Sequence, residues 1–136
     1  MMKRIASIVF AVLMLAVSAG ALEMEGVQIP ETITQADGTQ LVLNGAGVRS
    51  KFIFDIYIAQ LYLKEKNSDA AAVIQADAGR RIGMHFLYSE VSKEKLVETW
   101  NEGFEKNGTK EQLAALKGQI DAFNDMFETV KEGDQV

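Results

Sequence analysis

The stretch spanning residues 41–63 constrains the fold of this chain more than any other. It reads LVLNGAGVRSKFIFDIYIAQLYL: a short apolar run, an Asn44-Gly45 turn signal, and a long run rich in β-branched and aromatic residues. Asn-Gly readily adopts the positive φ angles of a tight hairpin. We therefore predict two antiparallel strands, residues 41–43 and 48–63, joined by this turn.

The predicted second strand has two different faces. Because side chains alternate between the faces of a strand, the even-numbered residues of 48–62 share one face. That face is the more apolar one and should meet the main core. The odd-numbered face begins with charges at Arg49, Lys51 and Asp55 and becomes apolar beyond Tyr57. A bulge within the run would exchange the two faces.

The glycine-rich start of this strand also carries a family resemblance. Residues 45–49 read Gly-Ala-Gly-Val-Arg, and the strand closes on Leu61-Tyr62-Leu63. This pattern resembles the signature of the chalcone isomerase-like family, and the resemblance extends through the predicted strand 80–88 and the helix starting near Ser92. It implies an open-faced β-sandwich. In that family, further strands and a closing helix follow the last long helix, so this chain, ending at Val136, is expected to be C-terminally truncated.

The first 21 residues have the pattern of a secretory signal peptide. Lys3 and Arg4 precede a nearly unbroken apolar run over residues 5–17, and Ala19-Gly20-Ala21 fits the small-x-small cleavage rule. The alternative is a membrane anchor, but a hydrocarbon core of ~30 Å requires about 20 apolar residues. We expect cleavage after Ala21 and one periplasmic or secreted domain, residues 22–136, without a membrane span.

Charge and cysteine content argue against several classes of function. The formal net charge of −5 becomes −7 once Lys3 and Arg4 are removed with the leader. Such an acidic surface repels nucleic-acid backbones and disfavours docking on anionic membranes. The sequence has no cysteine, which excludes disulfides, thiolate catalysis and cysteine metal sites. A domain of this size that is exported without disulfides suits a bacterial periplasm.

The order of the predicted elements indicates an α+β domain. Strand patterns come first and helix patterns follow, which favours an antiparallel β-sheet with helices packed on one face. The elements predicted outside the central stretch are an edge strand or extended lead-in over 24–33, a short helix over 69–76, a strand over 80–88, a helix capped by Ser92 and ended by Asn107-Gly108, and an amphipathic helix over 109–130 that begins with a Thr109-to-Gln112 capping box.

Arg49 is the first candidate ligand-binding residue. In chalcone isomerases the arginine of this motif faces the ligand cleft and meets a ligand oxygen, and in fatty-acid-binding members it meets a carboxylate. The resemblance implies the same role here. A planar guanidinium binds a carboxylate through two parallel hydrogen bonds and stays charged. The alternative is a strand-end arginine that pairs with an acid such as Asp55 or is solvated.

Tyr57 is the second candidate ligand-binding residue. It falls where chalcone isomerases carry a catalytic threonine, and a phenol can donate a hydrogen bond to a ligand oxygen. The alternative is a buried core tyrosine. The helical tyrosine and asparagine of the family fall near Ser92 and Thr99, so neither position has the expected residue. Only Arg49 of the isomerase set is retained, and the catalytic residues stay unknown.

Other polar and aromatic residues favour structural roles. His85 is the only histidine, so a typical zinc site is not expected, and no cofactor is implied. We interpret His85 as a sheet histidine rather than a catalytic base. Asp121, Asp125 and Glu128 recur at helical spacing without the order of a calcium loop, which is typical of a solvated helix face. Trp100 and Phe104 are expected in the core.

Three functions are compatible with these patterns. The leading hypothesis is a periplasmic, non-catalytic binder of a small apolar or carboxylate ligand such as a fatty acid, with Arg49 at its polar end. The first alternative is an intramolecular lyase of the chalcone-flavanone isomerase type. The second is a protein-interaction module that uses the amphipathic helix over 109–130. The oligomeric state stays open.

Overall fold

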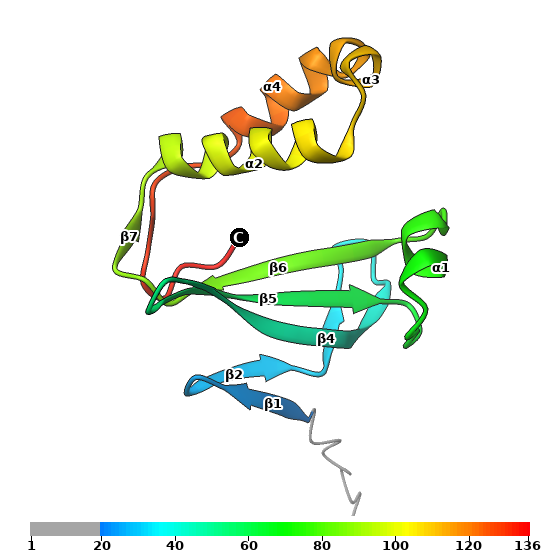
Figure 1. The fold of residues 1–136 in the computed structure, drawn as a ribbon. Coiled ribbons are helices and arrows are strands. Elements are labelled where there is room, and N and C mark those ends of the chain that lie inside the picture. Colours follow the sequence, from blue (N-terminus) through cyan, green and yellow to red (C-terminus); the bar gives the residue numbers. More distant parts are fainter. Residues whose placement is uncertain (1–19) are drawn as a thin grey trace, which may run out of the picture.

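The computed structural model describes residues 20–136, which form an α+β domain in three layers (Figure 1). The middle layer is a four-stranded antiparallel sheet, and a β-hairpin lies on one side of it while a group of helices lies on the other. This arrangement confirms the predicted α+β class with helices on one face. The sheet has the order β3 (Thr32–Thr34), β4 (Gln40–Lys51), β5 (Phe54–Leu63) and β6 (Arg80–Phe86).

The outer layers come from the two ends of the described chain. The hairpin consists of β1 (Ala21–Met24) and β2 (Val27–Pro30). The helical layer consists of α2 (Lys93–Asn107), α3 (Lys110–Ala115) and α4 (Lys117–Asp125), while the short α1 (Ala70–Gln75) links β5 to β6 at one end of the sheet. Most of the predicted signal peptide lies outside the described residues, and its cleavage point after Ala21 falls at the start of β1. The leader therefore stays a prediction.

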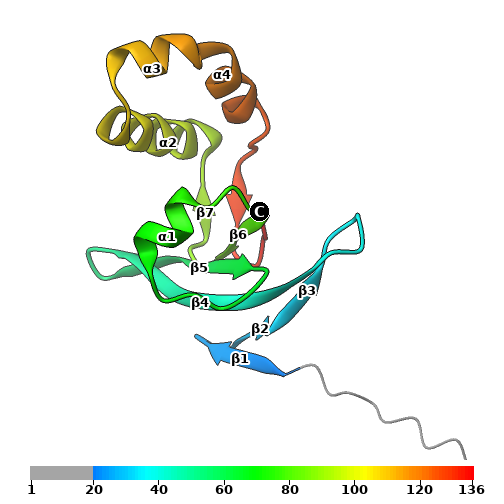
Figure 2. The same cartoon turned by 90° about the vertical axis from the view of Figure 1, so that its right-hand side faces the viewer.

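Two short strands connect the helical layer to the sheet. β7 (Glu90–Val91) leads into α2, and β8 (Val130–Lys131) follows α4 and pairs with β7. Figure 2 shows both segments running side by side between sheet and helices. The chain then turns back to β6, where the Met84 amide donates to the Val136 carbonyl over 2.8 Å and the Val136 amide donates to the Met84 carbonyl over 3.0 Å. The predicted C-terminal truncation stays a prediction.

The turn of the main hairpin lies at Phe52-Ile53, so the prediction of a turn at Asn44-Gly45 is wrong. β4 passes through Asn44-Gly45 as one twelve-residue strand. Leu43 and Gly45 oppose consecutive residues of β5, so Asn44 is the extra residue of a β-bulge. Its side-chain amide exchanges two hydrogen bonds with the backbone of Asn67, at 3.0 and 2.8 Å. Asparagine here anchors a distant loop instead of forming a turn.

The actual turn contains no residue that normally signals one. Lys51 and Phe54 pair across it, and Phe52 adopts a φ of 55°. The first position of a two-residue hairpin loop commonly has positive φ and is then usually asparagine, aspartate or glycine. A non-glycine residue pays roughly 1–2 kcal/mol for a left-handed conformation. Phe52 and Ile53 are 91% and 90% exposed, so the turn projects its apolar side chains into solvent.

Two hydrophobic cores lie on opposite faces of the sheet. Ile58 and Tyr62, on the even-numbered face of β5, are buried against the β1–β2 hairpin together with Ile29, Leu41 and Leu43. The prediction of one strand over 48–63 is wrong, because residues 48–51 belong to β4 and the turn follows them. The predicted face is correct over 58–62, where Ile58 and Tyr62 meet the hairpin, whereas Ile56 packs against the other core. The second core joins the other face to the helical layer, through Met84, Phe86, Leu96 and Val130.

The helix over 93–107 agrees with its prediction, whereas the helix over 109–130 does not. Ser92 caps α2 by accepting from the Lys95 amide, and the Thr109 capping box begins α3. The helix then breaks at Leu116, whose φ and ψ are −99° and 5°, and α4 ends at Asp125. The chain becomes extended because Val130 pairs with Val91 in β8 and is buried against the sheet.

Candidate functional site

A cleft of about 590 Å³ separates the sheet from α2 at the end that carries the β4–β5 turn. Small-molecule sites usually enclose roughly 300–1,000 Å³. The floor comes from β5 and β6, one wall comes from α2, and β7 and the turn lie at one end. The exposed residues Arg49, Lys51 and Phe52 line this end, which we call the mouth of the cleft. Most of the lining residues are apolar or aromatic, namely Phe52, Phe54, Ile56, Tyr57, Met84, Phe86, Tyr88, Val91, Leu96 and Trp100.

Arg49 and Tyr57 are neighbours in this cleft, through a geometry different from the predicted one. We expected them on one strand, eight residues apart. Instead, Arg49 on β4 directly opposes Tyr57 on β5, and Tyr57 opposes Phe86 on β6. Side chains in register across neighbouring strands share a face. The Tyr57 and Phe86 rings pack with centroids 5.6 Å apart, so a cation and two aromatic rings lie side by side on the floor.

A second β-bulge adds Phe54 to the same face. Tyr57 opposes Arg49, but Asp55 opposes Ser50, which leaves Ile56 as the extra residue. Because of this extra residue, the alternation of side chains shifts by one between the segments before and after Ile56. Phe54, which a regular strand would place opposite to Tyr57, therefore also lines the cleft. The mouth of the cleft consequently combines aromatic and basic side chains.

The carboxylate that was expected to compete for Arg49 is engaged elsewhere. Asp55 accepts a hydrogen bond from the Ser50 hydroxyl, and neither residue lines the cleft. Within residues 20–136, the ion pairs are Lys95 with Glu98 and Lys117 with Asp121, and neither involves Arg49. Pairing of Arg49 with Asp55 is therefore wrong, whereas the exposed guanidinium fits both the solvated alternative and a site for an anion.

The remaining charges of the cleft are mixed. Lys51 lines it on the same side as Arg49, while Glu90 and Glu102 line it from β7 and α2. The Lys95 ammonium is 2.6 Å from the Glu98 carboxylate. This hydrogen bond raises the pKa of Lys95 and lowers the pKa of Glu98. Lys95 is therefore paired, and an anionic ligand would meet Arg49 and Lys51 first.

Ser92 and Thr99 line the cleft, but the helix uses their hydroxyl groups. The Ser92 hydroxyl accepts from the Lys95 amide at 3.2 Å as the N-cap of α2. The Thr99 hydroxyl donates to the Lys95 carbonyl at 2.8 Å. The cleft is thus lined by all four residues that we compared with the catalytic residues of chalcone isomerases, namely Arg49, Tyr57, Ser92 and Thr99. Of these two helical positions, Thr99 donates its proton to the backbone, whereas Ser92 only accepts and keeps its proton free; neither position carries the tyrosine or asparagine that the resemblance led us to expect.

Trp100 has a role at the cleft that the sequence analysis missed. We expected it in the core, and its ring does pack on Phe123 and Phe127, with centroids 6.0 and 5.5 Å away. It is only partly buried, however, and also lines the cleft. Leu96, Thr99 and Trp100 follow the i, i+3, i+4 spacing of one helix face. That spacing signals a shared surface, but cannot say whether protein or ligand covers it.

The other polar candidates lie outside the cleft. His85 is half-buried on β6, opposite Ile58, and does not line the cleft. Asp121 pairs with Lys117 on the exposed surface of α4, as a solvated helix face should. In the described part of the chain, no cluster of three metal-ligating side chains occurs. None of the helices between residues 20 and 136 is long and apolar enough to cross a membrane.

The fold and the cleft together define a class of protein: an α+β domain whose antiparallel sheet and helices enclose an apolar cleft with an arginine at its mouth. A family model described as chalcone isomerase-like matches residues 21–136, and the chain therefore belongs to the chalcone isomerase-like family. This match confirms the family predicted from the turn and strand around Arg49. A comparison with curated proteins finds no match.

Proposed function

We propose that this protein is a non-catalytic, periplasmic member of its family that binds a small apolar carboxylate, such as a fatty acid. One observation carries the proposal. The Arg49 guanidinium, which has no ion-pair partner among the described residues, stands beside Tyr57 at the mouth of a cleft with an apolar floor. A fatty acid presents the same two parts, one charged end and one long apolar chain.

The two parts of the ligand would contribute differently to affinity. Each methylene group buried on Met84, Phe86 and Leu96 contributes about 0.8 kcal/mol. A charge-assisted hydrogen bond to Arg49 contributes roughly 1.5–3 kcal/mol. Burial of the acyl chain would therefore supply most of the affinity, while Arg49 and the Tyr57 phenol would fix which end of the ligand faces the mouth.

The polar groups of the cleft favour binding over isomerisation. Catalysis by electrostatic stabilisation requires donors aimed at the charge that develops in the transition state. The hydroxyl groups of Ser92 and Thr99 are bonded to helix backbone, and Tyr57 replaces a smaller threonine. We therefore expect no loss of chalcone absorbance above the uncatalysed rate. Turnover at about 1 s⁻¹ or faster, typical of enzymes, would contradict this part of the proposal.

Calorimetric titration with palmitate tests the binding site. Arg49→Ala should weaken binding by about 10- to 150-fold, as expected for one lost charge-assisted bond. Arg49→Lys should recover part of the loss, since an ammonium cannot make the two-pronged contact. Arg81→Ala is the matched control, because Arg81 is exposed on β6 outside the cleft. Circular dichroism confirms that each variant is folded.

A neutral ligand of equal length separates the charge from the chain. Hexadecanol should bind wild type and Arg49→Ala equally, because it offers no carboxylate to the guanidinium. Unchanged palmitate affinity in folded Arg49→Ala would make Arg49 a mere strand-end charge. The absence of any palmitate binding by the wild type would remove the proposal. N-terminal sequencing of exported protein tests the location, with Leu22 expected as the first residue.

A further inference from the structure

We propose that the β4–β5 turn docks this protein on the surface of a lipid bilayer, so that an acyl ligand can pass between the bilayer and the cleft. The proposal rests on the proposed function for the identity of the ligand. We define the hairpin tip as residues Lys51–Phe54. The apolar side chains of the tip would insert into the bilayer at the boundary between the lipid head groups and the acyl chains.

The tip concentrates exposed apolar side chains. Phe52, Ile53 and Phe54 are consecutive and are 91%, 90% and 49% exposed. Single exposed apolar residues are normal on protein surfaces. Other strongly exposed ones, such as Ile74 and Met126, stand apart in the sequence. A contiguous exposed apolar group of this kind marks an interaction surface more often than chance exposure does.

The backbone of the tip points to the same conclusion. Phe52 holds a φ of 55°, a conformation that glycine or asparagine adopts with less strain. A large aromatic ring at such a position gains nothing from burial within the domain, because it is almost fully exposed. Strained residues recur at functional positions, where another interaction offsets the strain. Insertion of the ring into lipid would be such an interaction.

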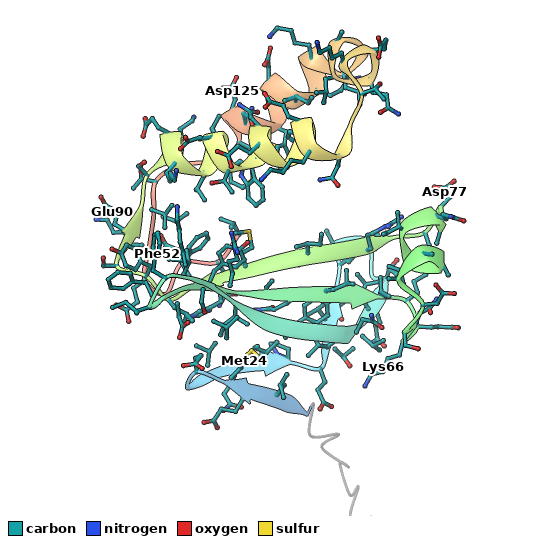
Figure 3. The ribbon with its side chains drawn as sticks, in the orientation of Figure 1. Met24, Phe52, Lys66, Asp77, Glu90 and Asp125 are labelled. Carbon is teal, nitrogen blue, oxygen red and sulfur yellow. The ribbon has the colours of Figure 1, made fainter. Side chains whose placement is uncertain are left out.

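The shape of the tip favours a bilayer over a protein partner. A stable protein interface buries about 800 Å² on each side. A two-residue turn at the end of a hairpin is narrow and offers only a few side chains (Figure 3). A bilayer demands no complementary shape, and aromatic and aliphatic side chains partition into its interface. Residues 40–54 contain no acidic side chain, but Glu90 and Glu102 line the neighbouring cleft, so the apolar side chains of the tip rather than Arg49 and Lys51 should carry the contact with the bilayer.

The tip is continuous with the cleft. Three residues of the tip line the cleft, namely Lys51, Phe52 and Phe54, and so does the nearby Arg49. A bilayer that covers the tip would therefore border the mouth of the cleft. An acyl chain could then leave the lipid over the Phe52 and Phe54 rings without crossing water, and its carboxylate would reach Arg49.

The net charge of the chain determines which lipids support docking. The chain is acidic overall, with a formal net charge of −5, so its surface as a whole is repelled by anionic lipid. The apolar tip should therefore carry the interaction, and docking should occur on zwitterionic vesicles. Flotation of the exported protein with phosphatidylcholine vesicles is the direct test, and a second series containing phosphatidylglycerol measures the contribution of Arg49 and Lys51.

The decisive variant is Phe52→Asn combined with Ile53→Ser. Asparagine tolerates the left-handed conformation, so the turn should be retained. We expect the wild type to float with phosphatidylcholine vesicles and the tip variant to lose binding by about tenfold or more. The control is Ile74→Ser combined with Met126→Ser, which removes two side chains that are 74% and 78% exposed elsewhere. The control should float like the wild type.

The outcomes separate this proposal from the proposed function. Arg49→Ala should lose palmitate affinity but still float with phosphatidylcholine vesicles. A wild type that binds palmitate but does not float would overturn docking alone. Equal flotation of the tip variant and the wild type would also overturn it. A further outcome is a wild type that fails to bind vesicles and self-associates in ultracentrifugation, with the tip variant losing that self-association. In that case the tip is a contact between copies of this chain.

Discussion

Replacing Phe52 with glycine should stabilise the protein, although an aromatic side chain is lost. The left-handed backbone at φ 55° costs phenylalanine roughly 1–2 kcal/mol, and glycine adopts it without that cost. Glycine also makes the unfolded chain more flexible, which lowers the free energy of unfolding by roughly 0.5–1 kcal/mol and offsets part of this gain. Phe52 is 91% exposed, so its removal sacrifices little buried apolar area. The net gain is about 0.5–1 kcal/mol in the free energy of unfolding.

Urea unfolding measures this gain directly. Trp100 is the only tryptophan, and its partly buried ring makes its fluorescence a single-site probe of the helical layer. With a slope of about 1–3 kcal/mol per molar urea, the midpoint should rise by a few tenths of a molar. The thermal midpoint should rise by about 2–5 °C.

Ile53→Gly is the matched control for Phe52→Gly. Ile53 is 90% exposed in the same turn but does not have a positive φ. Glycine there relieves no strain and should lower the free energy of unfolding by roughly 0.5–1 kcal/mol. The two variants should therefore shift the midpoint in opposite directions. If Phe52→Gly destabilises as much as Ile53→Gly does, the turn stores no strain at Phe52 and the reasoning is refuted.

Three further changes test the core, a buried phenol and a helix cap. Phe86→Ala should lower the free energy of unfolding by about 3–5 kcal/mol in urea, because its ring is 1% exposed between sheet and helices. The Tyr62 hydroxyl donates to the Pro30 carbonyl over 2.9 Å, and burial raises the pKa of Tyr62 above 10.0. This tyrosine therefore contributes stability that is present below pH 10.0 and is lost as pH rises through its folded pKa. Tyr62→Phe should cost about 1 kcal/mol at neutral pH and flatten the alkaline decline in thermal scans; an unchanged decline would assign it to other groups. Thr109→Ala should cost about 1 kcal/mol by removing the capping box of α3, and a loss no larger than the error would show that α3 is held by packing alone.

Local signals predicted the helix over 93–107, but long-range pairing decided the hairpin. Ser92 and Gly108 begin and end α2 through bonds within one turn, which the sequence shows directly. Asn44-Gly45 has an equally local turn signal. Its role depends instead on strand pairing and on Asn67, 23 residues away. No residue type marks Phe52-Ile53 as a turn, so its position could not be found without the register of β4 and β5.

The candidate site shows the same limit. Arg49 and Tyr57 were proposed from a family pattern, and they do share a face, although through cross-strand pairing rather than spacing along one strand. Phe54 joins them because Ile56 is a bulge, which alternation in the sequence cannot reveal. Phe86 and Trp100 approach the same cleft from β6 and α2. Their meeting depends on how the layers stack, which is a property of the whole chain.

The pairing of β7 with β8 makes the helical layer an exchangeable part. Glu90 opposes Lys131 and Val91 opposes Val130, so the chain leaves the sheet and returns to it at one place. A segment whose two ends are fixed side by side can be lengthened, shortened or replaced without changing the register of the strands beneath it. Evolution or design can therefore reshape the upper wall of the cleft through residues 93–129, while the sheet continues to present Arg49. The length of apolar ligand chain that the cleft accepts and its recognition of the charged end could then change independently in evolution.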